Sequence, residues 1–571
     1  MQTYYENVIL FGDTNTVSVI FLLIGRTFGI EKRYRTFMNE NNVIKSWDMI
    51  SRSIAGVFII LVLAVYPLSI RHFYFDILKA KYLYYYVGVI AITTIMLITA
   101  LFFVCKDYRI NGSENVKAFF RIVNIKRMKA VDWAMFSFVL MYAISTFQSD
   151  YLYESFWGNE GRLCGLFLIL LYGASYIIIV GCLRFKRVYL DAFLLAGIMA
   201  GVIGILQYFK FNPFGMKTGL SPSDQWIFTS TIGNVNTYTS YLSLLLGVGV
   251  ILFTQEKNHL RKIFYLLSVI VTMSSLVAGI SDNAYITFIV LLGLLPLYLF
   301  VDLNGVKQYT LILSILLTIL LVFGWIDNTI PQHVIKIEGL FEVIIQFHGL
   351  LYISIAMWVL TLTFFIIERK RGGVYNKSKR NIGRWIWLGV LILLAFVLLA
   401  ILYDVNILGN VQRYGILENY LLFNDNWGTH RGYIWRITFE SYQKFPLHHK
   451  IFGYGPETFG IVAVREYMTE SVRLYNERFD NAHNEYVHYF FTIGIAGVTA
   501  YLALLITSLK EMIHSATKKP VVMGIAFSLV CYWVQAAVNV STPIVSPIMF
   551  TLLMTGIAAC RTQENPEAEI K

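Results

Sequence analysis

The sequence carries little charge for its length. Charged residues make up 14% of the 571 residues, whereas a soluble domain has about 25%. Hydrophobic residues reach 57%. Because the deficit of charge extends over the whole chain, it excludes a soluble enzyme, a disordered chain and a fibrous repeat. A membrane protein with many spans is the class that remains.

Cysteine is also scarce, and its placement excludes two kinds of site. The chain has five cysteines, none of them in the segment 404–484 and no two at a metal-ligand spacing. We therefore expect neither a disulfide scaffold nor a zinc site. Outward-facing segments lack a paired Asp-x-Asp, so we expect no metal and no cofactor. The first residues lack the basic region of a cleaved signal peptide, and none is expected.

The positive net charge is best explained by the membrane topology of the chain. Lys and Arg number 47 and Asp and Glu number 35, a difference of +12. One alternate set of loops, which includes 106–130 and 368–384, carries roughly twice as many basic residues as the other set, and this places it and both termini in the cytoplasm. The charge therefore does not indicate nucleic acid as a partner, and it predicts a multi-pass membrane protein with both termini in the cytoplasm.

Apolar runs of spanning length predict an all-α polytopic membrane protein with about 14 transmembrane helices (12–14). A shorter apolar patch near 17–24 predicts an interfacial or re-entrant helix. The predicted spans are 54–70, 84–104, 131–147, 163–183, 189–208, 231–254, 263–280, 284–301, 309–325, 349–367, 385–403, 487–508, 520–539 and 543–560. The expected division is an N-terminal extension 1–130, a bundle 131–403, a large extracytoplasmic loop 404–484, C-terminal helices 485–560 and a cytoplasmic tail 561–571.

The 404–484 segment is too long for a connector and has an ordered pattern. Ile434, Trp435, Ile437, Phe439 and Tyr442 recur at helical spacing, and a Gly/Pro turn cluster follows at 452–456. Long structured loops on rigid scaffolds often carry function. We therefore look for an active site in this segment.

Two polar clusters precede the segment on the same predicted side. The first, at 158–165, holds Arg162, which either snorkels and pairs with Glu160 or serves as a phosphate ligand. The second, at 231–236, places Asn234 and Asn236 at the start of a span. One of these amides is expected to cap the helix, and the helix N-terminus is also a natural anion seat.

The third cluster lies within the long segment and carries the strongest signal. Arg431 and Arg436 precede the turn cluster, and His483 stands where the chain re-enters the membrane. Arginine grips phosphate oxygens with two parallel N–H groups, and histidine accepts a proton near neutral pH. Together they suit attack of a sugar hydroxyl on a carbon bonded to a lipid diphosphate.

The pattern resembles the O-antigen ligase / O-antigen polymerase family of bacterial membrane glycosyltransferases. An Arg followed by a Trp, a Pro before a Gly-x-Gly turn, and an Ala-His-Asn-x-Tyr step into a helix with paired glycines carry the resemblance. These residues are Arg431, Trp435, Pro446, Gly453, Gly455, Phe459, His483, Asn484, Tyr486, Gly494 and Gly497. Gly158, Arg162, Gly165, Gly233, Asn234 and Asn236 also match, so the similarity extends over roughly residues 150–500.

The resemblance implies a C-type glycosyltransferase-like bundle and an inverting, metal-independent reaction on an undecaprenyl-diphosphate-linked glycan. It implies that Arg431 contacts the diphosphate and that His483 is the base or orients the acceptor. The other candidate substrate-binding residues are Arg162, Asn234, Asn236, Arg436, Asn484 and Tyr486. At one position the chain departs from the family, because Asp282 follows Ser281 where an Arg is usual.

Ligase and polymerase activities remain open, because they differ only in the acceptor, which is a glycan, a lipid or a protein. The expected partners are the lipid-linked oligosaccharide donor, this acceptor and the bilayer. A polysaccharide flippase is the alternative from another class, and it predicts charged residues deep in the spans and an internal repeat. A non-catalytic membrane scaffold is the third possibility, but it leaves Arg431 and His483 without a role.

Overall fold

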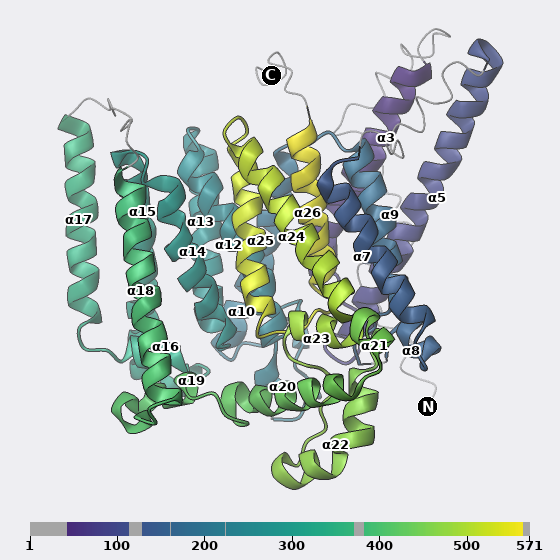
Figure 1. The fold of residues 1–571 in the computed structure, drawn as a ribbon. Helices are drawn as coiled ribbons and strands as arrows, with labels where there is room; N and C mark the ends of the chain where they lie inside the picture. Colours follow the sequence, from purple (N-terminus) through teal and green to yellow (C-terminus); the bar gives the residue numbers. More distant parts are fainter. Residues whose placement is uncertain (1–42, 113–127, 160, 223, 371–381, 563–571) are drawn as a thin grey trace, which may run out of the picture.

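The computed structural model describes residues 43–112, 128–159, 161–222, 224–370 and 382–562. The predicted interfacial or re-entrant helix near 17–24 and most of the two basic loops lie outside these ranges. Within them, ten helices are long and apolar enough to cross a membrane, and four more are apolar but shorter. The protein is therefore a multi-pass membrane protein. Its helices run roughly parallel to one another and form a bundle (Figure 1), which we call the helix layer.

Each predicted span coincides with a helix or contains most of one. The long helices are α3 (Val43–Ile60) continued through the π-helix η2 (Leu61–Val65) and α4 (Tyr66–Leu68), α5 (Ile77–Asn111), α7 (Ala130–Phe147), α10 (Val188–Tyr208), α12 (Val235–Gln255), α13 (His259–Ala278), α15 (Leu303–Thr329), α17 (Leu350–Lys370), α18 (Ile382–Asn406) and α24 (Gly494–Ala516). The shorter ones are α9 (Leu166–Cys182), α14 (Asn283–Leu299), α25 (Val521–Ala536) and α26 (Ser546–Arg561).

Helix α12 forms the centre of the bundle. It packs against α10, α13, α14 and α25, and most of its side chains are buried. Gly247 allows its close approach to α25, because a Cβ atom there would lie 2.3 Å from the backbone nitrogen of Ser528. In contrast, Val405 is the only buried residue of α18, as expected of a helix surrounded by lipid.

The predicted start of several spans was wrong. The first apolar helix begins at Val43 rather than at 54. Residues 231–234 are not helical, because β1 (Phe228–Thr229) pairs antiparallel with β2 (Gly233–Asn234) and α12 begins only at Val235. Hydropathy alone does not detect a hairpin with two-residue strands at a helix entrance, because it is averaged over a window much longer than the hairpin.

The predicted continuous span 487–508 was also wrong. The chain instead forms α23 (Glu485–Thr492), breaks, and continues as α24. Gly494 has a left-handed φ of 69°, and the turn at Gly453–Gly455 packs on the break. Tyr454 and Gly455 donate backbone hydrogen bonds to the carbonyl oxygens of Phe491 and Thr492 at 3.1 and 3.0 Å. The two predicted glycine motifs therefore meet each other.

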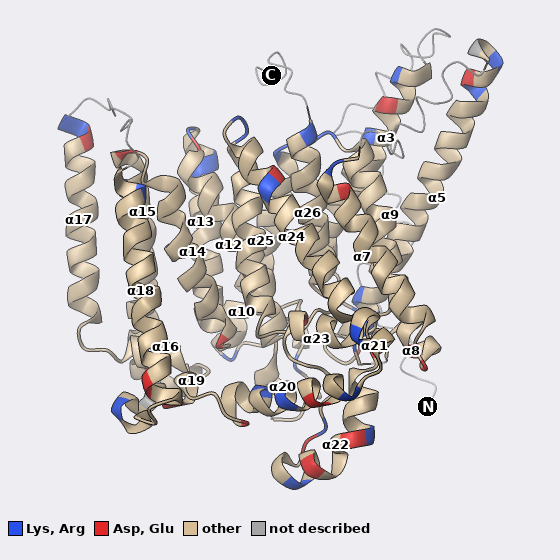
Figure 2. Ribbon diagram, viewed as in Figure 1, with Lys and Arg blue, Asp and Glu red and all other residues tan. Residues whose placement is uncertain are grey.

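The 404–484 segment covers one end of the helix layer. It folds as η7 (Val411–Leu417), α19 (Glu418–Leu421), α20 (Trp427–Lys444), α21 (Leu447–Phe452) and α22 (Phe459–Tyr475), which confirms the helical spacing predicted for 434–442. The ends of α5, α17 and α26 lie at the opposite end (Figure 1). Charged residues gather at the two ends of the layer and are sparse between them (Figure 2). We call the end that carries residues 404–484 the site end.

The predicted division into five parts stays a prediction, and helix packing crosses one of its boundaries. Helices α3 and α5, from the expected N-terminal extension, pack against α9 in the expected bundle.

Candidate active site

Arg431 lies at a bend in helix α20. Residues 428–430 have left-handed backbone angles, so the chain turns sharply just before Arg431. The Arg431 guanidinium donates one hydrogen bond to the carbonyl oxygen of Gly428, and its buried Nε has no hydrogen-bond partner among the described residues. Burial lowers the pKa of Arg431, and Asp282 opposes this effect. The guanidinium group of Arg431 is thus held in place, and some of its N–H groups are still free to donate hydrogen bonds.

His483 follows a tight turn immediately before helix α23. Its backbone N–H donates to Oδ1 of Asn481 at 2.8 Å, and its φ of 48° is left-handed. Nε1 of Trp435 on α20 donates to the carbonyl oxygen of Ala482 at 3.0 Å. Because Trp435 is one turn from Arg431 on α20, this bond fixes the His483 turn against the helix that carries Arg431.

Arg162 joins the same group from a different part of the chain. It lies between α8 (Leu152–Trp157) and α9, and its guanidinium forms an ion pair with Asp480 at 3.1 Å. The pKa of Asp480 is lowered: burial alone would raise it, but the Arg162 guanidinium outweighs that effect. Glu160, the partner considered above, lies outside the described residues, and the pair that the structure describes joins Arg162 to a residue more than 300 positions away.

The positive charges of Arg162 and Arg431 therefore both act on His483. Burial lowers the pKa of His483 to about 4, and the positive charges of Arg162 and Arg431 add to this effect, while Asp480 opposes it. The imidazole is neutral at physiological pH and lies in the field of two cations. Such a site is ready for an anionic group that binds to both guanidinium groups.

The remaining predicted residues have other partners. Asn234 caps α12 by accepting a hydrogen bond from the backbone of Asn236 at 2.9 Å. Asn484 caps α23 in the same way, and the Tyr486 hydroxyl donates to the carbonyl oxygen of Trp533 at 2.7 Å. These side chains shape the entrances of their helices, and their role toward a substrate stays a prediction.

Arg436 belongs to a separate cluster. Its guanidinium pairs with Asp425, Glu440 and Glu470 at 3.1, 2.9 and 3.0 Å, and these carboxylates raise its pKa. Three carboxylates therefore already occupy the guanidinium group that was predicted to bind substrate. Among the described residues, no hydrogen bond or ion pair joins Arg436 to His483.

One residue of the site was missed by sequence reasoning. Asp282, the departure from the family pattern, lies close enough to Arg431 for each group to shift the pKa of the other. Burial raises the pKa of Asp282, and Arg431 partly offsets the rise. Neighbouring Ser281 donates a hydrogen bond to Oδ1 of Asn236 at 2.7 Å. The hairpin that lacks the usual arginine thus supplies an acidic neighbour to Arg431.

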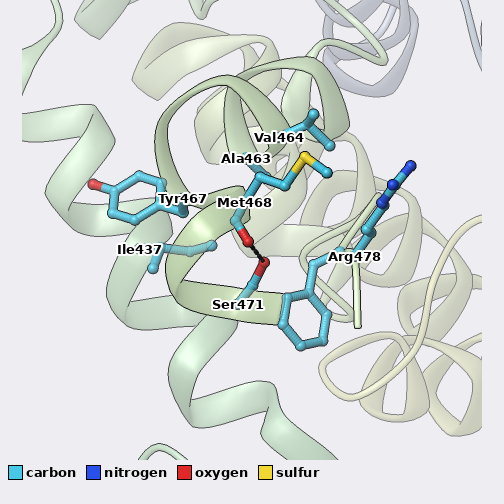
Figure 3. A pocket seen from close by; sticks show the side chains of 8 residues that line it. Ile437, Ala463, Val464, Tyr467, Met468, Ser471 and Arg478 are labelled. Carbon is cyan, nitrogen blue, oxygen red and sulfur yellow. Dashed lines mark hydrogen bonds between the residues drawn. The ribbon is translucent and has the colours of Figure 1, made fainter. Parts of the chain in front are cut away.

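A hollow elsewhere on the 404–484 segment contains none of the predicted site residues. It lies between α20 and α22 (Figure 3), and the hydroxyl of Ser471, one of its lining residues, donates to the carbonyl oxygen of Met468 at 3.1 Å. The lining residues are Ile437, Ala463, Val464, Tyr467, Met468, Ser471, Arg478 and Phe479.

Comparison with known families fits this geometry. Residues 343–502 match the family model described as O-Antigen ligase. This segment is an O-antigen ligase domain. The predicted resemblance is thereby confirmed, although the match begins near 343 rather than near 150. The O-antigen ligase domain contains Arg431, Arg436, His483, Asn484 and Tyr486, whereas Arg162, Asn234 and Asn236 lie outside it. No curated protein matches the chain at a significant level.

Proposed function

We propose that the protein is a membrane glycosyltransferase that transfers or polymerises an undecaprenyl-diphosphate-linked glycan at the outer face of the cytoplasmic membrane. The O-antigen ligase domain supports glycan transfer as the chemistry. The placement of the site end opposite the basic helix ends supports an outward-facing site (Figure 2). The observation that carries the proposal is the meeting of two guanidinium groups around a neutral His483.

The two arginines hold the donor and stabilise its leaving group. A diphosphate matches Arg431 and Arg162 in charge and in hydrogen-bonding geometry. As the acceptor oxygen bonds to the anomeric carbon from the opposite face, the bond from that carbon to the diphosphate breaks, with inversion. The electron pair leaves on the diphosphate, where the guanidinium groups stabilise the growing charge without a metal ion.

Donor binding also prepares the base. In the free protein, part of the pKa depression of His483 comes from Arg162 and Arg431. A bound diphosphate neutralises these cations, so the pKa of His483 rises and the imidazole becomes a stronger proton acceptor. His483 therefore deprotonates or orients the acceptor hydroxyl only when the donor is in place.

Transfer by the purified protein tests the proposal. We expect labelled glycan to move from undecaprenyl diphosphate to an acceptor, and Arg431→Ala to reduce kcat by about 10²–10³. His483→Ala should reduce kcat by about 10²–10⁴ and leave donor binding intact. Arg465→Ala, which removes an arginine paired with Glu466 at 3.0 Å, is the matched control and should retain activity. Full activity in both site variants would refute the assignment.

The same assay separates the alternatives. A flippase would move the lipid-linked glycan across a vesicle membrane without forming a new glycosidic bond. A ligase would accept a lipid or protein anchor, whereas a polymerase would accept a second carrier-linked glycan.

A further inference from the structure

A small cavity lies next to the candidate active site. Two carboxyl groups and an imidazole are among its lining groups: those of Glu457, which precedes α22, and of Glu485 and His488 on α23. Their exposed fractions are only 3%, 2% and 8%. The cavity measures about 10 Å³, close to the space that one water molecule needs. Two carboxyl groups and an imidazole in so small a buried volume cannot all be charged at low cost.

These side chains have unused hydrogen-bonding atoms. One carboxylate oxygen of Glu457, one of Glu485 and Nδ1 of His488 have no hydrogen-bond partner among the described residues. Nε2 of His488 lies 3.7 Å from Oε1 of Glu457, which is too far for a direct hydrogen bond. The other oxygen of Glu485 accepts a hydrogen bond from the Tyr501 hydroxyl at 2.5 Å. The cluster therefore offers several atoms that can accept a proton.

The cavity adjoins the predicted catalytic residues along the chain and in space. Asn481, which lines the cavity, accepts the backbone hydrogen bond of His483. Cys164, which also lines it, lies two residues from Arg162, and His488 lowers the pKa of His483. Glu457 and His483 both have left-handed backbone angles, with φ of 61° and 48°. Such strain persists only where the surroundings enforce it, and it is common at functional sites.

We propose that Glu457, Glu485 and His488 form a buried proton-binding site that receives the proton released from the acceptor hydroxyl. This inference rests on the proposed function. The O–H bond of the acceptor breaks as its oxygen bonds to the anomeric carbon, and the proton passes through His483 and a water in the cavity to the carboxylate of Glu485. The electron pair of the cleaved bond leaves on the diphosphate, and the proton later returns to bulk water.

His483 itself is poorly suited to keep the proton, because burial, the largest cause of its lowered pKa, persists when the donor neutralises the two arginines. Burial raises the pKa of Glu485 to about 7, and hydrogen bonds from Tyr501 and Tyr532 oppose the rise. The carboxyl group can therefore exchange a proton near neutral pH. The titratable groups that face it are Tyr142 on α7, Cys164 before α9, Glu457 before α22, Tyr486, His488 and Tyr489 on α23, Tyr501 on α24 and Tyr532 on α25.

The pH profile of transfer tests the proposal. In the wild type, kcat should fall below about pH 7, where Glu485 becomes protonated and cannot accept a proton. Glu485→Gln should lower the maximal kcat about tenfold or more and remove this acid limb. Tyr501→Phe removes a bond that stabilises the carboxylate, so the limb should move to higher pH. Glu470→Gln, the control, removes a carboxylate that pairs with Arg436 at 3.0 Å and should keep the wild-type profile.

Two outcomes overturn the inference. One is a Glu485→Gln variant with the wild-type kcat and acid limb, and the other is a Tyr501→Phe variant whose limb does not move. If Glu485→Gln fails to fold, as judged by its melting temperature, Tyr501→Phe decides. Failure of the proposed function is recognised separately, because the wild type would then show no transfer at any pH.

Discussion

The charge state of His483 is set first by burial and then by a few neighbouring charged side chains. Arg162 and Arg431 come from segments more than 250 residues apart, yet both depress the pKa of this imidazole. Asp480 and Asp282 each balance one of these cations. Nε of each arginine has no hydrogen-bond partner among the described residues, so each guanidinium group can still donate to a phosphate oxygen.

Replacement of Arg162 should change the titration of His483. In Arg162→Gln, the loss of a nearby cation favours the imidazolium ion, so the pKa of His483 should rise above its value of about 4. The rise should be partial, because burial is the largest cause of the depression. The pH dependence of His483 modification by diethyl pyrocarbonate, followed by mass spectrometry of its peptide, measures this. Arg465→Gln serves as the control, and an unmoved midpoint in Arg162→Gln would contradict the electrostatic account.

His483 should also make stability depend on pH. Its pKa is about 4 in the folded protein and about 6.5 in an unfolded chain. The unfolded state therefore binds more protons between these values, and stability is lost as the pH falls from 6.5 to 4. The melting temperature of the wild type should decrease over this window, and His483→Gln should weaken the decrease. Parallel curves for the two proteins would show that His483 is not buried in its neutral form.

The identity of the site residues was easier to predict from the sequence than the side chains that lie beside them in the structure. The motif spacing pointed to Arg431 and His483, because the arginine and histidine of the family pattern stand in the sequence itself. The contact of Arg431 with Asp282 joins residues about 150 positions apart, and no local pattern encodes it. The cluster of Glu457, Glu485 and His488 was missed for the same reason, since burial of these groups follows only from the packing of several helices.

At the scale of elements, the break between α23 and α24 positions the site. The turn at Gly453–Gly455 packs on the break, and α23 carries Glu485 and His488 on the cavity side of it. Hydropathy located the apolar helices well because each span is a local property of the sequence. It missed the break because Phe490, Phe491 and Ile493 are as apolar as the helix that follows.

Gly494→Ala should disrupt this junction. The residue has a left-handed φ of 69°, and an added Cβ would lie 2.4 Å from the backbone nitrogen of Gly453. We expect a loss of about 2–5 kcal/mol in the free energy of unfolding, from backbone strain and steric overlap. Thermal unfolding in detergent measures the loss. Gly88→Ala in α5, where an added Cβ meets no atom within 4 Å, should be neutral or slightly stabilising, and equal effects of the two changes would argue against the tight junction.

At the scale of the whole molecule, the two ends of the helix layer differ in kind. One end carries the helices of the 404–484 segment and the converging site residues, and the other carries the ends of α5 and α17 that lead into the basic loops (Figures 1 and 2). Basic loops stay in the cytoplasm during insertion. The site end should therefore face outward.

Labelling of introduced cysteines tests this orientation. Glu477→Cys at the site end should react with a membrane-impermeant thiol reagent in intact cells, whereas Arg369→Cys at the end of α17 should react only after permeabilisation. Both changes are made with Cys105→Ser, because Cys105 is the exposed native cysteine of the described chain. The reverse pattern would place the site in the cytoplasm and contradict the proposed function.

The most direct test of the central claim is binding of undecaprenyl diphosphate to the purified protein. Arg431→Gln and Arg162→Gln should each weaken binding about tenfold or more, since each removes charged hydrogen bonds to the diphosphate. Arg465→Gln, which removes an equal charge at the same end of the molecule, should bind like the wild type. Equal affinity in all four proteins would contradict a diphosphate site between Arg162, Arg431 and His483.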